Sequence, residues 1–169
     1  MTAMHGIKGL TDAVDGPVYV LADRLVATTG NATGFHIGAG GTARVGAMLV
    51  DAATPEGVSA SLRLPAGWAT VNVDLLWANA GAGAGDVVWR GDRGALTVGS
   101  APPANTSTTL PAATAAAQHV VTQTTLFTGV ATPAAGALFT IGTLRVATDA
   151  ADTLANDAAI VGFVISKAS

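Results

Sequence analysis

The sequence of 169 residues contains no cysteine, which excludes disulfide bonds, thiolate metal sites and cysteine nucleophiles. Charge is also scarce, because Asp, Glu, Lys and Arg make up 11% of the chain against about 25% in an average protein. The net charge of −3 and the scattered Lys and Arg residues exclude a general nucleic-acid-binding protein, which needs clustered cations. Such a thin polar coat suggests a chain that covers much of its surface with other protein subunits.

A long hydrophobic run is missing as well. The longest compact apolar segment is AIVGFVI at 159–165, whereas a membrane-spanning helix needs about 20 such residues. The first residues, MTAMHGIKGLTDAVDG, lack the charged start and apolar centre of a signal peptide. We therefore expect no membrane partner, and assembly in the cytoplasm of the cell that makes the protein.

Residues 94–144 contain no Asp, Glu, Lys or Arg, and His119 is their only titratable side chain. Flexible linkers are usually charged or rich in Gly and Ser, whereas this segment is rich in Thr, Ala, Pro, Val and Leu. It is either an ordinary β-region with threonine facing solvent or a surface facing other subunits, where charge would be costly to desolvate. The low charge of the whole chain favours the second interpretation.

Apolar and polar residues alternate through most of the sequence, which is the period of a half-buried strand. We expect strands at 17–28, 43–50, 57–65, 70–79, 85–90 with 94–99, 118–130, 137–148 and 158–166. About eight strands without crossover helices predict an all-β fold, an antiparallel β-sandwich of jelly-roll type. Residues 1–16 are expected to form an N-terminal arm and 17–169 one domain, in which 100–117 is an extended loop.

Gly38, Gly40 and Ala43 spell G-x-G-x-x-A, the pattern of a dinucleotide-binding loop. That site requires a strand before the loop, a helix after it and a parallel strand beyond. Here the residues that follow alternate as a strand, so the glycines are expected to form a turn. GAGAG at 81–85 likewise joins two expected strands and offers no helix N-terminus to a phosphate.

No catalytic or metal-binding constellation emerges from the sequence. The acids of the 149–157 segment could bind Ca²⁺, but their spacing is not that of an EF-hand, and such residues commonly cap turns. No G-x-S-x-G motif is present. The three tryptophans are expected to pack in the core and at its rim rather than to form a sugar platform. The histidines lie far apart, with His119 inside an expected strand: His5, His36 and His119. We therefore expect neither an enzyme nor a cofactor.

Three segments together form a distinctive pattern, each with its own motif: DAATPEGVSASLRLPAGW (51–68), VNVDLLWANAGAGAGDVVWR (71–90) and RVATDAADTLANDAAIVGFVI (145–165). An R-x-P precedes a strand closing in Trp, a G-D-V-x-W strand follows, and R-x-x-x-D-x-x-D-T-L leads into a last apolar strand. This pattern resembles jelly-roll virion structural proteins of tailed bacteriophages, namely head decoration (cement) proteins and related fibre modules. The residues in these places are Arg63, Pro65, Trp77, Asp86, Trp89, Arg145 and Asp152.

The resemblance covers about residues 43–166 and implies a virion protein without catalytic residues. The first hypothesis is a homotrimeric cement protein, assembled in the host cytoplasm, that binds the major capsid protein on the outer surface of a phage head. Binding only to the assembled lattice would stabilise adjacent capsomers by mass action. The arm and the 100–117 loop would supply intersubunit contacts from His5, Lys8, Leu10, Pro102, Pro103, Leu110 and Pro111.

The alternative hypothesis is a receptor- or glycan-binding module of a tail fibre or spike, using Trp and Asp residues exposed on end loops. The sequence shows neither a stalk nor a fibrous repeat, and it has a single tyrosine. These features favour the decoration protein.

Overall fold

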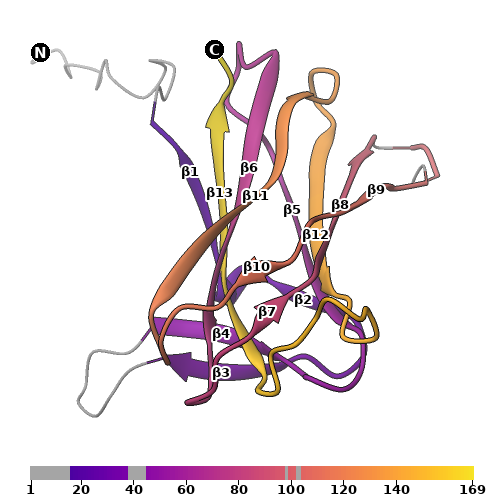
Figure 1. Cartoon of the computed structure of the whole chain (residues 1–169). Helices are drawn as coiled ribbons and strands as arrows, with labels where there is room; N and C mark the ends of the chain where they lie inside the picture. The colour runs from indigo at the N-terminus through magenta and orange to yellow at the C-terminus, as the bar shows by residue number, and fades with distance from the viewer. Residues whose placement is uncertain (1–15, 38–44, 98, 102–103) are drawn as a thin grey trace, which may run out of the picture.

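Two antiparallel β-sheets packed face to face make up the described part of the computed structural model, which is residues 16–37, 45–97, 99–101 and 104–169 (Figure 1). Sheet A contains β1 (Val18–Leu21), β3 (Thr33–Ile37), β4 (Val45–Val50), β6 (Thr70–Asn79), β11 (Val121–Ala131) and β13 (Ala158–Lys167). Sheet B contains β2 (Val26–Thr29), β5 (Glu56–Leu62), β8 (Trp89–Leu96), β9 (Thr106–Thr109) and β12 (Leu138–Arg145). The remaining elements are a ribbon of β7 (Asp86–Val87) with β10 (Ala113–Thr114) and a 3₁₀ turn, η1 (Ala22–Arg24).

The strand order is that of a jelly roll. Sheet A runs β11-β6-β13-β4-β3, and β1 also pairs with β13; sheet B runs β2-β5-β12-β8-β9. Four strands of each sheet, β4-β13-β6-β11 and β5-β12-β8-β9, therefore interleave along the chain as in an eight-stranded jelly roll. Within the described residues, no helix is long and apolar enough to cross a membrane. The predicted all-β, jelly-roll-like sandwich is confirmed.

Alternation along each strand places one side in the core between the sheets. On β6, Val71, Val73, Leu75 and Trp77 are all fully buried. The rings of Trp77 and Trp89 meet edge to face with centroids 5.4 Å apart, a geometry worth about 0.5–1.5 kcal/mol beyond burial. All three tryptophans are at most 4% exposed, so their expected packing role is confirmed.

A buried ion pair fixes the connection between β12 and β13. Arg145 and Asp152 have almost no exposed side-chain surface, and their Nη2 and Oδ1 atoms are 2.7 Å apart. The guanidinium also donates to the carbonyl oxygens of Leu154 and Asn156. Asp152 Oδ2 accepts the backbone N–H of Val88 at 3.1 Å. The R-x-x-x-D-x-x-D-T-L motif is thus a structural clamp that ties the 146–157 segment to the strands beside it.

The segment 17–28 is not the single strand that the sequence predicts. It forms β1 in sheet A and β2 in sheet B, joined by η1. Ala22 and Leu25 are buried where the chain passes from one sheet to the other, so the connection also contributes apolar side chains to the core. Periodicity alone does not reveal a change of sheet, because both halves keep the extended pattern.

The segment 100–117, expected to be an extended loop, contains two short strands. β9 pairs with β8, and β10 pairs with β7. All four β9 residues are exposed Thr or Ser, so the strand lacks the apolar alternation that would predict it. Main-chain pairing with the edge of β8, rather than burial, defines β9.

Candidate functional site

The outer face of sheet A, which points away from the core, is apolar around β3, β4, β13 and the end of β6, and polar where Asn72, Asp74, Gln123 and Thr125 face outward. Its residues alternate with core residues along the same strands: Ala78 follows Trp77, and Ala159 precedes Ile160. A second hydrophobic cluster covers the face around β3, β4, β6 and β13. Its buried members are Ile37, Ala47, Ala78, Ala159 and Val161, with Phe35, Leu49, Leu76 and Ala80 packed against them.

Large apolar side chains remain exposed around this cluster. Tyr19 and Leu21 on β1 are 57% and 48% exposed, Val45 on β4 is 48% exposed, and Val121 on β11 is 45% exposed. Tyr19 and Leu21 alternate with Val18 and Val20, which face the core. We call the outward residues of sheet A, including the second cluster and these four, the apolar face.

Asp74 is the only charged side chain that the described strands of sheet A place on the apolar face. Its carboxylate accepts a hydrogen bond from Gln123 Nε2 at 3.0 Å and from Thr125 Oγ1 at 2.6 Å. Both donors lie on the neighbouring strand β11. The apolar face therefore carries one charge, and that charge is hydrogen-bonded within the sheet.

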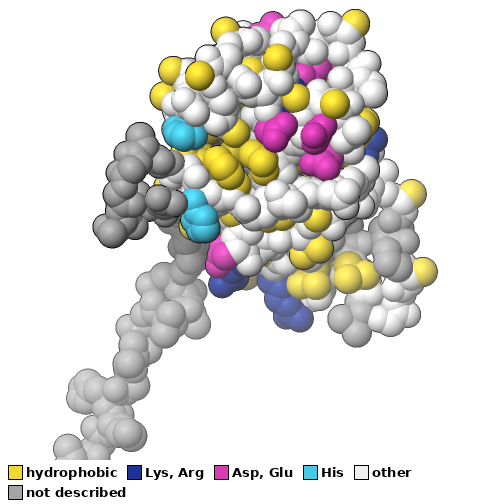
Figure 2. Space-filling model, turned by 90° about the horizontal axis from the view of Figure 1, so that it is seen from below, with side chains coloured by type: hydrophobic (Ala, Val, Ile, Leu, Met, Phe, Trp, Pro, Cys, Tyr) yellow, Lys and Arg dark blue, Asp and Glu magenta, His cyan; other side chains and the backbone are white. Residues whose placement is uncertain are grey.

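The apolar face continues to one end of the sandwich, where acidic side chains border it. Figure 2 shows hydrophobic side chains gathered between the histidines and a group of acidic side chains. A hollow there is lined in part by Phe35, Leu49 and Asp157. The His119 ring lies 6.4 Å from that of Phe35. His119 has a φ of 63° and precedes β11, so the expectation that it lies inside a strand is wrong; the chain turns here.

The acids at this end fix backbone turns rather than an ion. Both carboxylate oxygens of Glu56 accept backbone N–H groups, from Asn31 and Asp51, at 2.8 Å. Asp157 accepts the N–H of Ala52 at 3.1 Å. Glu56 thus connects its own strand to Asn31 and to the turn at Asp51, and Asp157 connects the start of β13 to the same turn.

Asp51 begins an exposed turn at the same end of the sandwich. Its Oδ1 accepts the backbone N–H groups of Ala53 and Thr54 in a tight turn. These two hydrogen bonds, the larger from Ala53, hold the pKa of the Asp51 carboxyl below its ordinary value of 3.8. The ionised Asp51 carboxylate therefore stabilises this exposed turn by accepting both backbone hydrogen bonds.

The calcium site considered for 149–157 does not form around its three aspartates. Asp152 is paired with Arg145, Asp149 accepts the N–H of Ala151, and Asp157 faces Ala52. Among the described residues, no group of three or more His, Asp and Glu side chains is placed to hold a metal ion.

The outer face of sheet B is polar. A groove of about 190 Å³ lies on it, lined in part by Ser59, Thr140, Asn105 and the Arg90–Asp92 ion pair, whose Nη2 and Oδ2 atoms are 3.1 Å apart. Gly142 belongs to its lining, and a Cβ there would lie 3.0 Å from the Val58 carbonyl oxygen. No aromatic side chain lines the groove, so it offers hydrogen bonds but no stacking surface.

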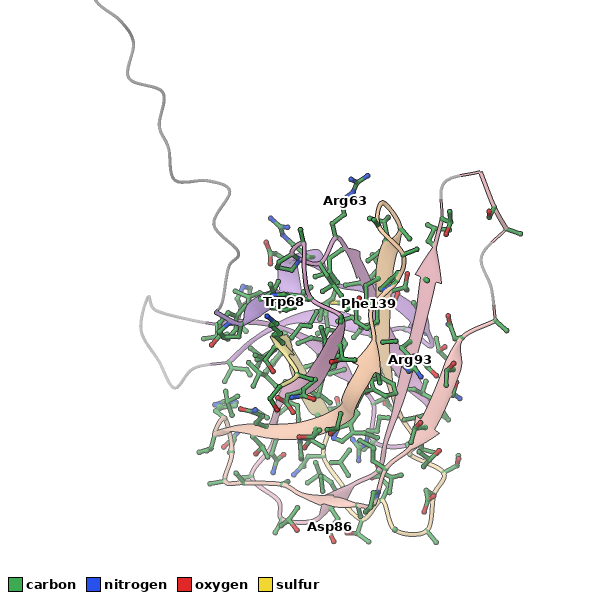
Figure 3. The ribbon with its side chains drawn as sticks, turned by 90° about the horizontal axis from the view of Figure 1, so that it is seen from above. Arg63, Trp68, Asp86, Arg93 and Phe139 are labelled. Atoms are coloured by element: carbon green, nitrogen blue, oxygen red, sulfur yellow. The ribbon has the colours of Figure 1, made fainter. Side chains whose placement is uncertain are left out.

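A larger cavity of about 430 Å³ lies at the other end of the sandwich, between the 63–68 and 132–137 connections. Trp68 and Phe139 line it but are only 4% and 2% exposed. Arg63 extends away from the body of the molecule at its rim (Figure 3). Arg63 and Pro65 of the sequence motif both lie here. The rings of Trp68 and Phe139 are too deeply buried to stack on a ligand in this cavity.

The other residues of the phage-like pattern also have structural places. The Asp86 carbonyl oxygen accepts the N–H groups of Thr153 and Leu154, and the Asp86 N–H donates to Thr153 Oγ1 at 2.9 Å. Trp77 and Trp89 form the core pair, and Arg145 holds Asp152. None of these side chains gathers into a binding site.

The expected intersubunit contacts are placed only in part. Leu110 is half-buried and packs against the core, and Pro111 is exposed. The others lie outside the described residues: His5, Lys8, Leu10, Pro102 and Pro103. Intersubunit contact through these residues stays a prediction.

The glycine motifs do not form nucleotide sites of the kind considered. Gly38, Gly40 and Ala43 lie outside the described residues. The strands on either side of them, β3 and β4, pair antiparallel, which excludes the parallel βαβ unit of a dinucleotide fold. GAGAG at 81–85 joins β6 to β7, as predicted.

The sequence carried a signal for the apolar face that strict alternation hides. In VYVL (18–21) and AIVGFVI (159–165), residues of both parities are apolar, so each strand has two apolar sides. On β6, Leu76 and Ala78 stand where alternation would place polar residues. Strands with two apolar sides are typical of sheets that are covered on both faces.

No family model matches the sequence, and no curated protein matches it. Among solved structures, the chain is similar to a family 11 carbohydrate-binding module from Clostridium thermocellum in complex with a β-1,3-1,4-mixed-linked tetrasaccharide. The identity is 12% and the TM-score 0.47, over 90% of this chain and 96% of that one. It is also similar to part of an arabinose-bound α-L-arabinofuranosidase, at 13% identity and a TM-score of 0.39, over 94% of this chain and 27% of that one. Neither likeness transfers a ligand or an activity to this chain.

Proposed function

We propose that the protein is a structural virion protein that attaches to other protein subunits through its apolar face, as a decoration protein on the outer surface of a phage head. The observation that carries the proposal is the exposure of Tyr19, Leu21, Val45 and Val121 on one face where the described strands place a single charged side chain, which is hydrogen-bonded. The phage-like sequence pattern supplies the virion context and the major capsid protein as the partner.

Exposing such a face to water costs free energy, which burial against another protein would recover. Contiguous apolar patches are uncommon on soluble monomers and usually mark interaction sites. Interface centres are depleted in charge and enriched in aromatic residues, because a charge would have to be desolvated. The apolar face combines both features, and Tyr19 is the one tyrosine of the chain.

The test is attachment to intact heads that lack the protein. Bound copies are counted by sedimentation and gel densitometry as the protein concentration rises. Saturation in proportion to the icosahedral lattice is expected for a decoration protein, whereas a handful of copies would contradict this function.

Variants connect that result to the apolar face. The double substitution Tyr19→Ser with Leu21→Ser should weaken head attachment, because it removes two exposed apolar side chains. Val26→Ser is the matched control: Val26 is 64% exposed but lies on β2 of sheet B. Equal attachment by the double variant and the control would assign binding to another surface.

A second candidate function is glycan binding by the groove on sheet B. Hydroxyl and amide groups beside the Arg90–Asp92 pair suit a hydroxyl-rich ligand. All three tryptophans are buried, so a glycan cannot stack on them, and the version of this hypothesis that uses exposed tryptophans is wrong. Calorimetric titration with host-surface glycans, using Asp92→Asn as the comparison, tests it: binding that Asp92→Asn abolishes would favour this function over head decoration.

The homotrimer and the absence of catalysis stay predictions from the sequence. The mass of the free protein in solution tests the first.

A further inference from the structure

β11 is an open edge of sheet A. It pairs with β6 on one side and with no described strand on the other (Figure 1). With 11 residues it is the longest of the described edge strands, since β3 has 5 and β2 and β9 have 4 each. An edge strand exposes unpaired N–H and C=O groups, which can pair with another chain.

The two halves of β11 are protected differently. Register shifts between Thr125 and Phe127 and between Phe127 and Val130 disrupt the second half, and Gly129 there has a φ of 61°. Such bulges twist an edge away from a partner. The first half, Val121–Thr125, pairs without interruption with Ala78 to Asp74 of β6.

The first half also lacks the other devices that blunt an edge. Its sequence, VTQTT, contains neither a charge nor a proline. Val121, Gln123 and Thr125 are exposed, and valine and threonine favour strands. The segment is therefore regular, neutral and accessible.

We propose that Val121–Thr125 pairs antiparallel with the same segment of a second copy about a two-fold axis centred on Gln123. Self-pairing sets Gln123 opposite its own copy and Val121 opposite Thr125 of the other copy. Every facing pair is neutral, whereas like charges placed directly opposite would be destabilising. Val121–Thr125 itself carries no charge with which a charged strand could pair, so a neutral strand fits it best, and the same segment of a second copy is neutral.

The pairing makes one continuous sheet of the two A sheets. Because both apolar faces then lie on the same side of that sheet, the dimer presents them next to each other. The inference concerns the edge of the sheet and does not rest on head decoration. A two-fold pair is a dimer, which differs from the trimer expected from the sequence.

The test is the solution mass of the full chain over a range of concentrations, by sedimentation equilibrium. The expected result is a reversible species of twice the chain mass of 16.6 kDa. Gln123→Glu sets two like charges face to face, next to the Asp74 carboxylate of each copy, and should raise the dissociation constant by up to about fivefold.

Thr128→Glu is the matched control, because it adds the same charge to the bulged half of β11 and should leave the dimer intact. Mixing Gln123→Glu with Gln123→Lys should restore pairing between unlike copies. A monomer at all concentrations, a trimer, or a dimer equally insensitive to both glutamate variants would overturn the proposal. Circular dichroism melts of each variant establish that the sandwich is folded.

Discussion

Arg145, one of the residues of the phage-like sequence pattern, has a structural place in the fold. A guanidinium, with donors in a fixed fork, suits recognition of an anionic ligand. Here its hydrogen bonds go to Asp152 and to the carbonyl oxygens of Leu154 and Asn156, all within the chain. The Arg145 side chain has no exposed surface, so a ligand cannot reach its guanidinium.

Removing one partner of this buried pair should be costly. Arg145→Ala leaves the Asp152 carboxylate buried without its cation, and we expect a loss of about 3–5 kcal/mol in the free energy of unfolding. Urea denaturation measures it. Arg90→Ala, which breaks the partly exposed Arg90–Asp92 pair, is the comparison and should cost about 1 kcal/mol or less. Similar losses of unfolding free energy in the two variants would contradict the structural role of the buried Arg145–Asp152 pair.

Asp51 gives a pH-dependent prediction. Because its folded-state pKa lies below 3.8, the charged form stabilises the fold above that pH. This stabilisation is lost as the pH falls through the lowered folded-state value. Asp51→Asn keeps an acceptor but not the charge, so the wild-type advantage in urea midpoint should be present near neutral pH and shrink below 3.8. A constant difference down to pH 2 would show that the charge is not the cause.

At the scale of elements, alternation located strands that face a core on one side, and the expected 70–79 agrees with β6 (Thr70–Asn79). The expected 158–166 agrees with β13 (Ala158–Lys167), although that strand is apolar on both sides. Alternation could not locate β9, whose Thr and Ser residues are all exposed and whose strand character comes from pairing with β8. The apolar face was also missed, because its residues come from six strands that only the folded register brings together.

Gly162 controls how two strands share one edge of β13. The first half of β13 pairs with β4 and the second half with β1, and the register against β6 shifts between Ile160 and Gly162. A Cβ at Gly162 would overlap the Val20 carbonyl oxygen of β1. The absence of a side chain therefore lets β1 approach.

Gly162→Ala should displace β1 and lower the free energy of unfolding by about 1–3 kcal/mol. Hydrogen exchange should report earlier loss of protection at Val18–Leu21 than elsewhere in sheet A. Gly46→Ala on β4 is the control, because nothing lies within 4 Å of a Cβ there. Unchanged protection of β1 in Gly162→Ala would contradict this account.

At the scale of the molecule, the two outer faces differ in kind. The apolar face carries exposed Tyr, Leu and Val side chains beside polar residues of β6 and β11, while sheet B turns outward Ser, Thr, the Arg90–Asp92 pair and one exposed apolar side chain, Val26. A molecule built this way has one side suited to contact with protein and another suited to water. Attachment through sheet A would therefore leave sheet B facing outward, with its groove accessible.

This division predicts how head attachment responds to salt. Because the apolar face has one charge that is already hydrogen-bonded, affinity should change little between low salt and about 1 M, where the Debye length falls to about 3 Å. Burial of apolar surface should also give a negative heat-capacity change of binding. Titration calorimetry at several temperatures and salt concentrations measures both quantities. A steep loss of affinity with salt would place binding on charged groups such as the acids beside the apolar face, and not on Tyr19 and Leu21.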